Sequence, residues 1–209
     1  MDALDRIVRV WWQNRVANLA LLFGRRQAAE RAYRRIVAIA PDNNFARMVL
    51  GNLLAERGDE AGAAEQFLSV VERDDKQADA WFNLGFLYEK RQELEQAERC
   101  FRKAVELKPG LDRAWYGLGL VLIAQGRLEE ATAALKKNVK LQPFSPYGYY
   151  QLAMTWVNLG KSDEAWKVQR ELEKFEPKYA RTLARDLEQA RPAPSDAAAQ
   201  QGGESQAAH

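Results

Sequence analysis

The sequence predicts an all-α fold that is built from repeated pairs of helices. Three residue types recur along the 209-residue chain with a spacing of 34 residues and without insertions. Two positions of this pattern hold another residue: Asp75 stands where a proline is expected, and Gln92 stands where a glycine is expected. Self-similarity at one fixed period is the sequence signature of repeat architectures, in which each unit stacks on its neighbours into a solenoid. The recurring residues are prolines (Pro41, Pro109, Pro143, Pro177), glycines (Gly24, Gly58, Gly126, Gly160) and alanines (Ala29, Ala63, Ala97, Ala131, Ala165).

The glycines and prolines divide each unit into two helices. A glycine ends the first helix and allows the turn into the second, and a proline stops the second helix before the next unit begins. In the first unit, this pattern predicts helices over residues 10–23 and 26–40. The same pair should recur every 34 residues, which gives units over residues 10–43, 44–77, 78–111, 112–145 and 146–179.

The third unit carries the residues that relate this chain to a known family. Its signature positions are Trp81, Leu84, Gly85, Tyr88, Ala97, Phe101 and Pro109. This arrangement resembles the tetratricopeptide repeat, and the resemblance extends over residues 10–179. The resemblance implies a right-handed superhelical solenoid of helix-turn-helix repeats. It also implies that the first helix of each unit lines a concave face.

The segments outside the five units have different characters. Residues 1–9 are expected to form an N-terminal helical extension. Residues 180–191 are expected to form a polar capping helix, because Leu183 and Leu187 lie on one helical stripe with charged residues around them. Residues 192–209 consist mainly of Ala, Gln, Gly, Ser and Pro without an apolar period, and they are expected to be disordered.

The N-terminal helix carries more apolar side chains than one neighbouring helix can cover. A large exposed apolar patch usually marks an interface, and we therefore predict an N-terminal interface at Ile7, Trp11, Trp12 and Leu19. Three interpretations remain open. The helix packs within its own array, it contacts a second copy or a partner protein, or it lies on a membrane surface.

The tetratricopeptide resemblance places one stripe of every first helix in the concave groove. This stripe combines aromatic rings with amides and a guanidinium group. Such a surface suits an extended or helical peptide, because rings bury apolar area and amides bond to the peptide backbone. The groove could instead hold the protein's own tail or solvent. The predicted peptide-binding residues are Asn52, Phe82, Asn83, Phe86, Arg113, Tyr116, Tyr147 and Tyr150.

Few residues of the sequence suit catalysis or metal binding. Cys100 and His209 are the only cysteine and the only histidine, and the sequence contains no phosphate-binding glycine loop and no nucleophile elbow. We therefore expect no enzyme activity, no cofactor and no metal. The 31 basic and 29 acidic residues nearly balance, which argues against nucleic acid as a partner.

The same features bound the location and the role of the protein. Residues 1–10 lack the basic start and the apolar block of a signal peptide, and no run of 18 apolar residues could span a membrane. The sequence thus predicts a cytoplasmic, bacterial-type scaffold, adaptor or assembly factor that binds a segment of a partner protein. The alternative is a membrane-peripheral or self-assembling structural protein that is organised through its N-terminal helix.

Overall fold

A computed structural model describes residues 3–190 of the chain. Over this range the secondary structure consists of eleven α-helices and contains no strand. The chain divides into two compact parts, residues 1–121 and residues 122–209. The tail that we expect to be disordered, residues 192–209, lies outside the described residues, and so does Arg191 at the end of the expected capping helix.

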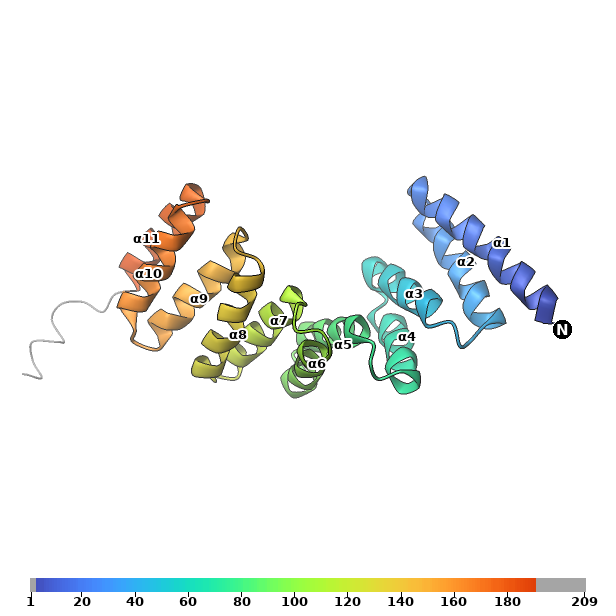
Figure 1. Ribbon diagram of the computed structural model, residues 1–209, viewed down its shortest axis with the longest axis horizontal. Helices are drawn as coiled ribbons and strands as arrows, with labels where there is room; N and C mark the ends of the chain where they lie inside the picture. Colours follow the sequence, from blue (N-terminus) through green and yellow to red (C-terminus); the bar gives the residue numbers. More distant parts are fainter. Residues whose placement is uncertain (1–2, 191–209) are drawn as a thin grey trace, which may run out of the picture. The chain divides into compact units, whose positions relative to one another are not determined.

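Pairs of neighbouring helices build the first part (Figure 1). The two helices of each pair pack against each other, and the second helix of one pair packs on the first helix of the next. The first helix of the chain is one continuous element of 20 residues, so the expected extension and the expected first repeat helix form a single helix. The helices are α1 (Ala3–Leu22), α2 (Arg26–Ile39), α3 (Asn44–Arg57), α4 (Glu60–Arg73), α5 (Ala78–Lys90), α6 (Leu94–Leu107) and the beginning of α7 (Asp112–Ala124).

The second part ends in a helix that takes the position of a further repeat. The helices of this second part are α8 (Leu128–Leu141), α9 (Pro146–Asn158), α10 (Ser162–Glu173) and α11 (Pro177–Gln189). Helix α11 packs on α10 and touches α9, and its buried side chains include Leu183 and Leu187. It begins at Pro177, three residues before the expected start, because proline fits the first turn of a helix, where its missing N–H group leaves no bond unmade.

The turn between the two helices of each unit uses a left-handed backbone conformation. Gly24, Gly58, Gly126 and Gly160 have φ angles between +67° and +88°. Gln92 adopts the same conformation with φ of +61°, so the unit without glycine keeps the turn in spite of backbone strain. The glycine pattern in the sequence therefore marks real helix ends.

The turn between successive units is held by a side chain of the following helix. In each case a donor near the start of a first helix bonds to the backbone carbonyl oxygen six residues earlier. This contact explains why large donor side chains recur at the fourth position of these units. The four donor–acceptor pairs are Arg47 Nε to Pro41 at 2.9 Å, Trp81 Nε1 to Asp75 at 2.7 Å, Trp115 Nε1 to Pro109 at 2.8 Å, and the Tyr149 hydroxyl to Pro143 at 3.2 Å.

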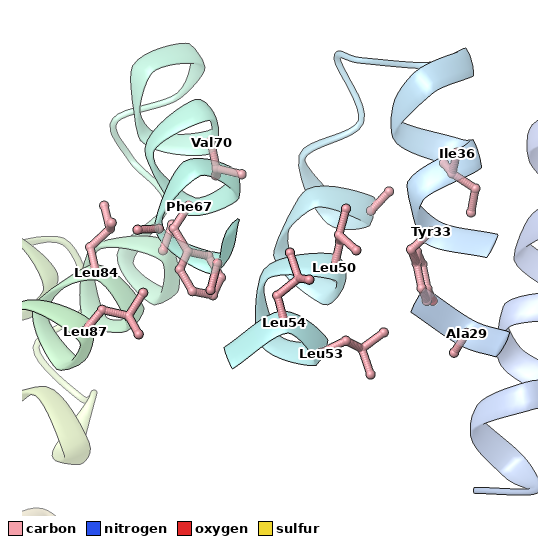
Figure 2. Close-up of a cluster of buried hydrophobic side chains, with 14 of the residues drawn as sticks. Ala29, Tyr33, Ile36, Leu50, Leu53, Leu54, Phe67, Val70, Leu84 and Leu87 are labelled. Atoms are coloured by element: carbon pink, nitrogen blue, oxygen red, sulfur yellow. The ribbon is translucent and has the colours of Figure 1, made fainter. Parts of the chain in front are cut away.

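Small, aliphatic and aromatic side chains together form the core. Figure 2 shows side chains of α2 and α4 on either side of α3, with Tyr33 on the side toward Leu50 and Leu53. Tyr33, Phe67 and Phe101 are almost completely buried. Burial of these side chains between units couples each helix pair to the next, because a single pair cannot cover its own apolar stripe.

Candidate functional site

The first part of the chain contains a hollow that is formed by its first helices. It has a volume of about 590 Å³ and is open to solvent. Most of the lining side chains come from α3, α5 and α7, so three successive units contribute to one surface, and Phe67 of α4 also lines it. The lining residues are Met48, Asn52, Ala55, Glu56, Phe67, Asp79, Phe82, Asn83, Phe86, Leu87 and Arg113. Five of the eight predicted peptide-binding residues are among them.

Two phenylalanines form the apolar wall of the hollow. Phe82 packs its ring on the buried ring of Phe101, with 6.0 Å between the ring centroids, and this contact holds it in place. Phe86, one turn further along α5, leaves 51% of its surface exposed. Such a ring is available to a ligand without repacking of the core, because removing it from water is favourable.

Asn52 and Asn83 lie side by side in the lining of the hollow. Asn83 Nδ2 donates a hydrogen bond to Asn52 Oδ1 at 3.0 Å. This bond fixes the orientation of both amides. It leaves the amide nitrogen of Asn52 as a donor and the oxygen of Asn83 as an acceptor, which together match the carbonyl and N–H groups of a peptide backbone.

Charges of both signs surround the apolar wall. The guanidinium group of Arg113 stacks over the Phe82 ring, with its Cζ atom 4.8 Å from the ring centroid. Asp79 forms an ion pair with Lys108 at 3.2 Å, and Glu56 pairs with Arg26. Because these pairs are exposed and screened by water, they can exchange partners at little cost when a charged ligand enters.

The remaining predicted residues lie elsewhere. Tyr116 is half-buried on α7 and does not line the hollow. Tyr147 and Tyr150 belong to the second part, where both contact α11. The Tyr147 ring lies 6.1 Å from that of Tyr179, and the Tyr150 hydroxyl donates to Asp186 Oδ2 at 2.7 Å. The hydrogen bond to this carboxylate, together with burial, raises the pKa of Tyr150.

Comparison with known proteins decides the family. Over residues 7–209 the sequence matches the family described as the C-terminal domain of cilia and flagella-associated protein 70. The chain belongs to this tetratricopeptide family. No curated protein matches the sequence.

Solved tetratricopeptide structures share the fold of this chain. MamA protein is 24% identical, with a TM-score of 0.74 over 83% of this chain and 94% of the other. MamA from Desulfovibrio magneticus is 21% identical, with a TM-score of 0.74 over 81% and 96% of the two chains. YrrB, described as a TPR protein with an unusual peptide-binding site, is 19% identical, with a TM-score of 0.70 over 83% and 88%. The predicted all-α tetratricopeptide fold is thus confirmed.

The tetratricopeptide register explains which lining residues could be predicted. Asn52, Phe82, Asn83 and Arg113 occupy the concave stripe of their first helices, and this stripe is periodic. Glu56 and Leu87 are two of the six lining residues that were not among the predicted ones. They lie one turn further along α3 and α5, where the hollow extends toward the ends of the first helices. Glu56 follows no repeat pattern, because Lys90 and Ala124 stand at the equivalent positions, whereas Leu87 belongs to the repeated packing positions Leu53, Leu87 and Val121.

The predicted N-terminal interface residues of this tetratricopeptide chain are exposed on α1 but do not share one face, because Ile7 and Trp11 line one hollow and Trp12 lines another. Ile7, Trp11, Trp12 and Leu19 each expose more than half of their surface, between 56% and 64%. Among residues 3–190, no helix combines the length and the apolar character that crossing a membrane requires. The described residues also contain no group of three or more His, Cys, Asp or Glu that could hold a metal ion.

Proposed function

We propose that this protein is an interaction scaffold, adaptor or assembly factor that binds a peptide segment of another protein in the hollow of α3, α5 and α7. The observation that carries the proposal is the amide pair Asn52 and Asn83 next to the exposed ring of Phe86. The amides offer one donor and one acceptor to a peptide backbone, and the ring offers apolar contact to a side chain. The unusual peptide-binding site described for YrrB, which has the same fold, supports the same class of ligand.

Arg113 adds a preference for an acidic side chain in the peptide. It lies at the edge of the apolar wall, where its stacking on Phe82 keeps the guanidinium group above the hollow. Binding of this kind involves no turnover, and the proposed function is therefore not enzymatic. The cytoplasmic and bacterial-type setting expected from the sequence remains part of the proposal.

Selection from a random peptide library on the full chain tests the proposal. We expect Phe86→Ala to lower the affinity for the selected peptides by about tenfold or more, because aromatic anchors dominate such interfaces. Asn83→Ala should also lower this affinity, because it removes the acceptor oxygen and the hydrogen bond that orients Asn52. The matched control is Phe45→Ala, which removes a comparably exposed ring of α3 that does not line the hollow.

Two results would show that peptides bind outside this hollow. One is a set of selected peptides whose affinity is the same for wild type and Phe86→Ala. The other is an equal loss for Phe45→Ala and Phe86→Ala. The alternative role predicted from the sequence, a membrane-peripheral or self-assembling protein organised through α1, concerns a different face and is tested below.

A further inference from the structure

One face of α1 corresponds to a face that is buried in every later unit. In the following first helices, three positions per unit face the second helix of the preceding unit. The equivalent positions in α1 are Trp12, Val16 and Leu19. The buried counterparts are Ala46, Leu50 and Leu53 in α3, Ala80, Leu84 and Leu87 in α5, Ala114, Leu118 and Val121 in α7, and Gly148, Leu152 and Thr155 in α9.

Contacts in the later units show what normally covers these positions. Figure 2 shows Leu50 and Leu53 of α3 on the side toward α2. At Gly148 an added β-carbon would meet the side chain of Asn138 on α8. A second helix therefore lies against this face in both units. In α1, by contrast, Trp12 is 58% exposed and Leu19 is 57% exposed, and no helix of residues 3–190 covers them.

Trp12 is also much larger than the residues at the equivalent position of the other units. The other units hold Ala46, Ala80, Ala114 or Gly148 there, and these small residues allow the backbones of two helices to approach closely. An indole ring at the same position prevents this approach. A covering element must therefore offer a gap for the ring, which a repeat helix packed at the usual distance does not.

Basic side chains surround this face of α1. Beside Trp12, a hollow of about 550 Å³ opens between α1 and the end of α2, and Val8, Arg9, Arg35 and Ile39 are among the residues that line it. Arg31 lies one turn before Arg35 on α2. Arg9 forms an ion pair with Asp5 of the same helix at 2.9 Å, whereas within residues 3–190 neither Arg31 nor Arg35 forms an ion pair.

We propose that this face of α1 binds an acidic amphipathic helix of another protein. The helix would take the place that a second repeat helix has in the later units, with its apolar stripe on Trp12 and Leu19 and its carboxylates toward Arg31 and Arg35. A second copy of the chain fits less well, because a two-fold contact would bring the same arginines together. A flat lipid surface fits less well, because the ring and guanidinium groups border a concave hollow rather than a convex ridge.

A library of helical peptides displayed on phage and selected on the full chain tests this inference. We expect enriched sequences with apolar residues at helical spacing and an excess of Asp and Glu. Trp12→Ala should lower the affinity for these peptides at least about tenfold. The matched control is Trp11→Ala, because Trp11 is 56% exposed on the same helix but lies outside this hollow. Arg35→Glu should weaken them more than Arg25→Glu, and the difference should shrink at high salt.

Other outcomes would overturn the inference. They are the absence of enriched helices, enriched helices without acidic excess, and equal losses for Trp11→Ala and Trp12→Ala. A full-length dimer that Trp12→Ala converts to a monomer in sedimentation equilibrium would assign the face to a second copy. Sedimentation with phosphatidylcholine–phosphatidylserine vesicles that Trp12→Ala abolishes would assign it to a membrane. Phe86→Ala should leave the enriched helices unaffected, so failure here is distinct from failure of the peptide site.

Discussion

The ring of Phe101 lies so close to Gly117 that a β-carbon on this glycine would stand 2.6 Å from its Cζ atom. The same ring would lie 2.8 Å from a β-carbon on Gly85. Phe101 of α6 thus packs against glycines of two successive first helices, α5 and α7. This arrangement joins two repeats through one buried side chain, and it depends on the absence of side chains at both glycines.

Gly117→Ala should therefore destabilise the protein, although alanine is the better helix former. A glycine in a helix usually costs about 0.5–1 kcal/mol relative to alanine. Overpacking against a buried ring costs about 1–3 kcal/mol, and it should outweigh this gain. We expect a lower free energy of unfolding in urea. Gly110→Ala is the control, because a β-carbon there meets nothing within 4 Å. Equal stability of both variants would show that Phe101 can move aside.

Trp115→Phe tests the bond that holds the turn between units. The variant keeps a ring at this position but removes the indole N–H that donates to the carbonyl oxygen of Pro109 at 2.8 Å. A typical net hydrogen bond contributes about 1 kcal/mol, so we expect a loss of this size in the free energy of unfolding. Trp12→Phe serves as the control, because Trp12 is exposed. If the two variants unfold alike, water replaces the lost bond without penalty.

Cys100 predicts a specific dependence of stability on pH. Burial raises the pKa of its thiol to about 11 in the folded protein. The unfolded thiol has a lower pKa, so between the two values only the unfolded state releases the proton. The free energy of unfolding should therefore fall as pH rises through this window, by about 1 kcal/mol at pH 10.

Cys100→Ala isolates this contribution of the thiol. The variant loses stability through the missing sulfur at every pH, but its stability relative to wild type should improve between pH 7 and pH 10. Ionisable groups away from Cys100 titrate alike in both proteins and cancel in the comparison. Tyr88 is the exception, because burial and then the charge of Cys100 raise its pKa. Urea unfolding at the two pH values measures the difference. A constant gap between wild type and Cys100→Ala would mean that the buried thiol ionises as readily as a free one.

The period of the sequence determined the helices and the turns between them. Gly58 and Gly126 end their helices because a left-handed residue is needed there, and glycine adopts this conformation without strain. Asn52, Phe82, Asn83 and Arg113 could be placed on one surface because the spacing of first helices repeats. Local conformation and helical periodicity are properties of short segments, and a single sequence carries them in full.

The tertiary structure alone decided which faces remain uncovered. Tyr150 has the register of a groove residue, but α11 lies next to it and Asp186 accepts the hydrogen bond of its hydroxyl. Trp12 has the register of a buried stacking residue, but no described helix lies against it. Glu56 lines the same hollow as side chains of α5, and only the packing of successive units could bring them together. Each of these outcomes depends on which element packs next to a given face, and helical periodicity fixes the direction of a side chain without fixing its neighbour.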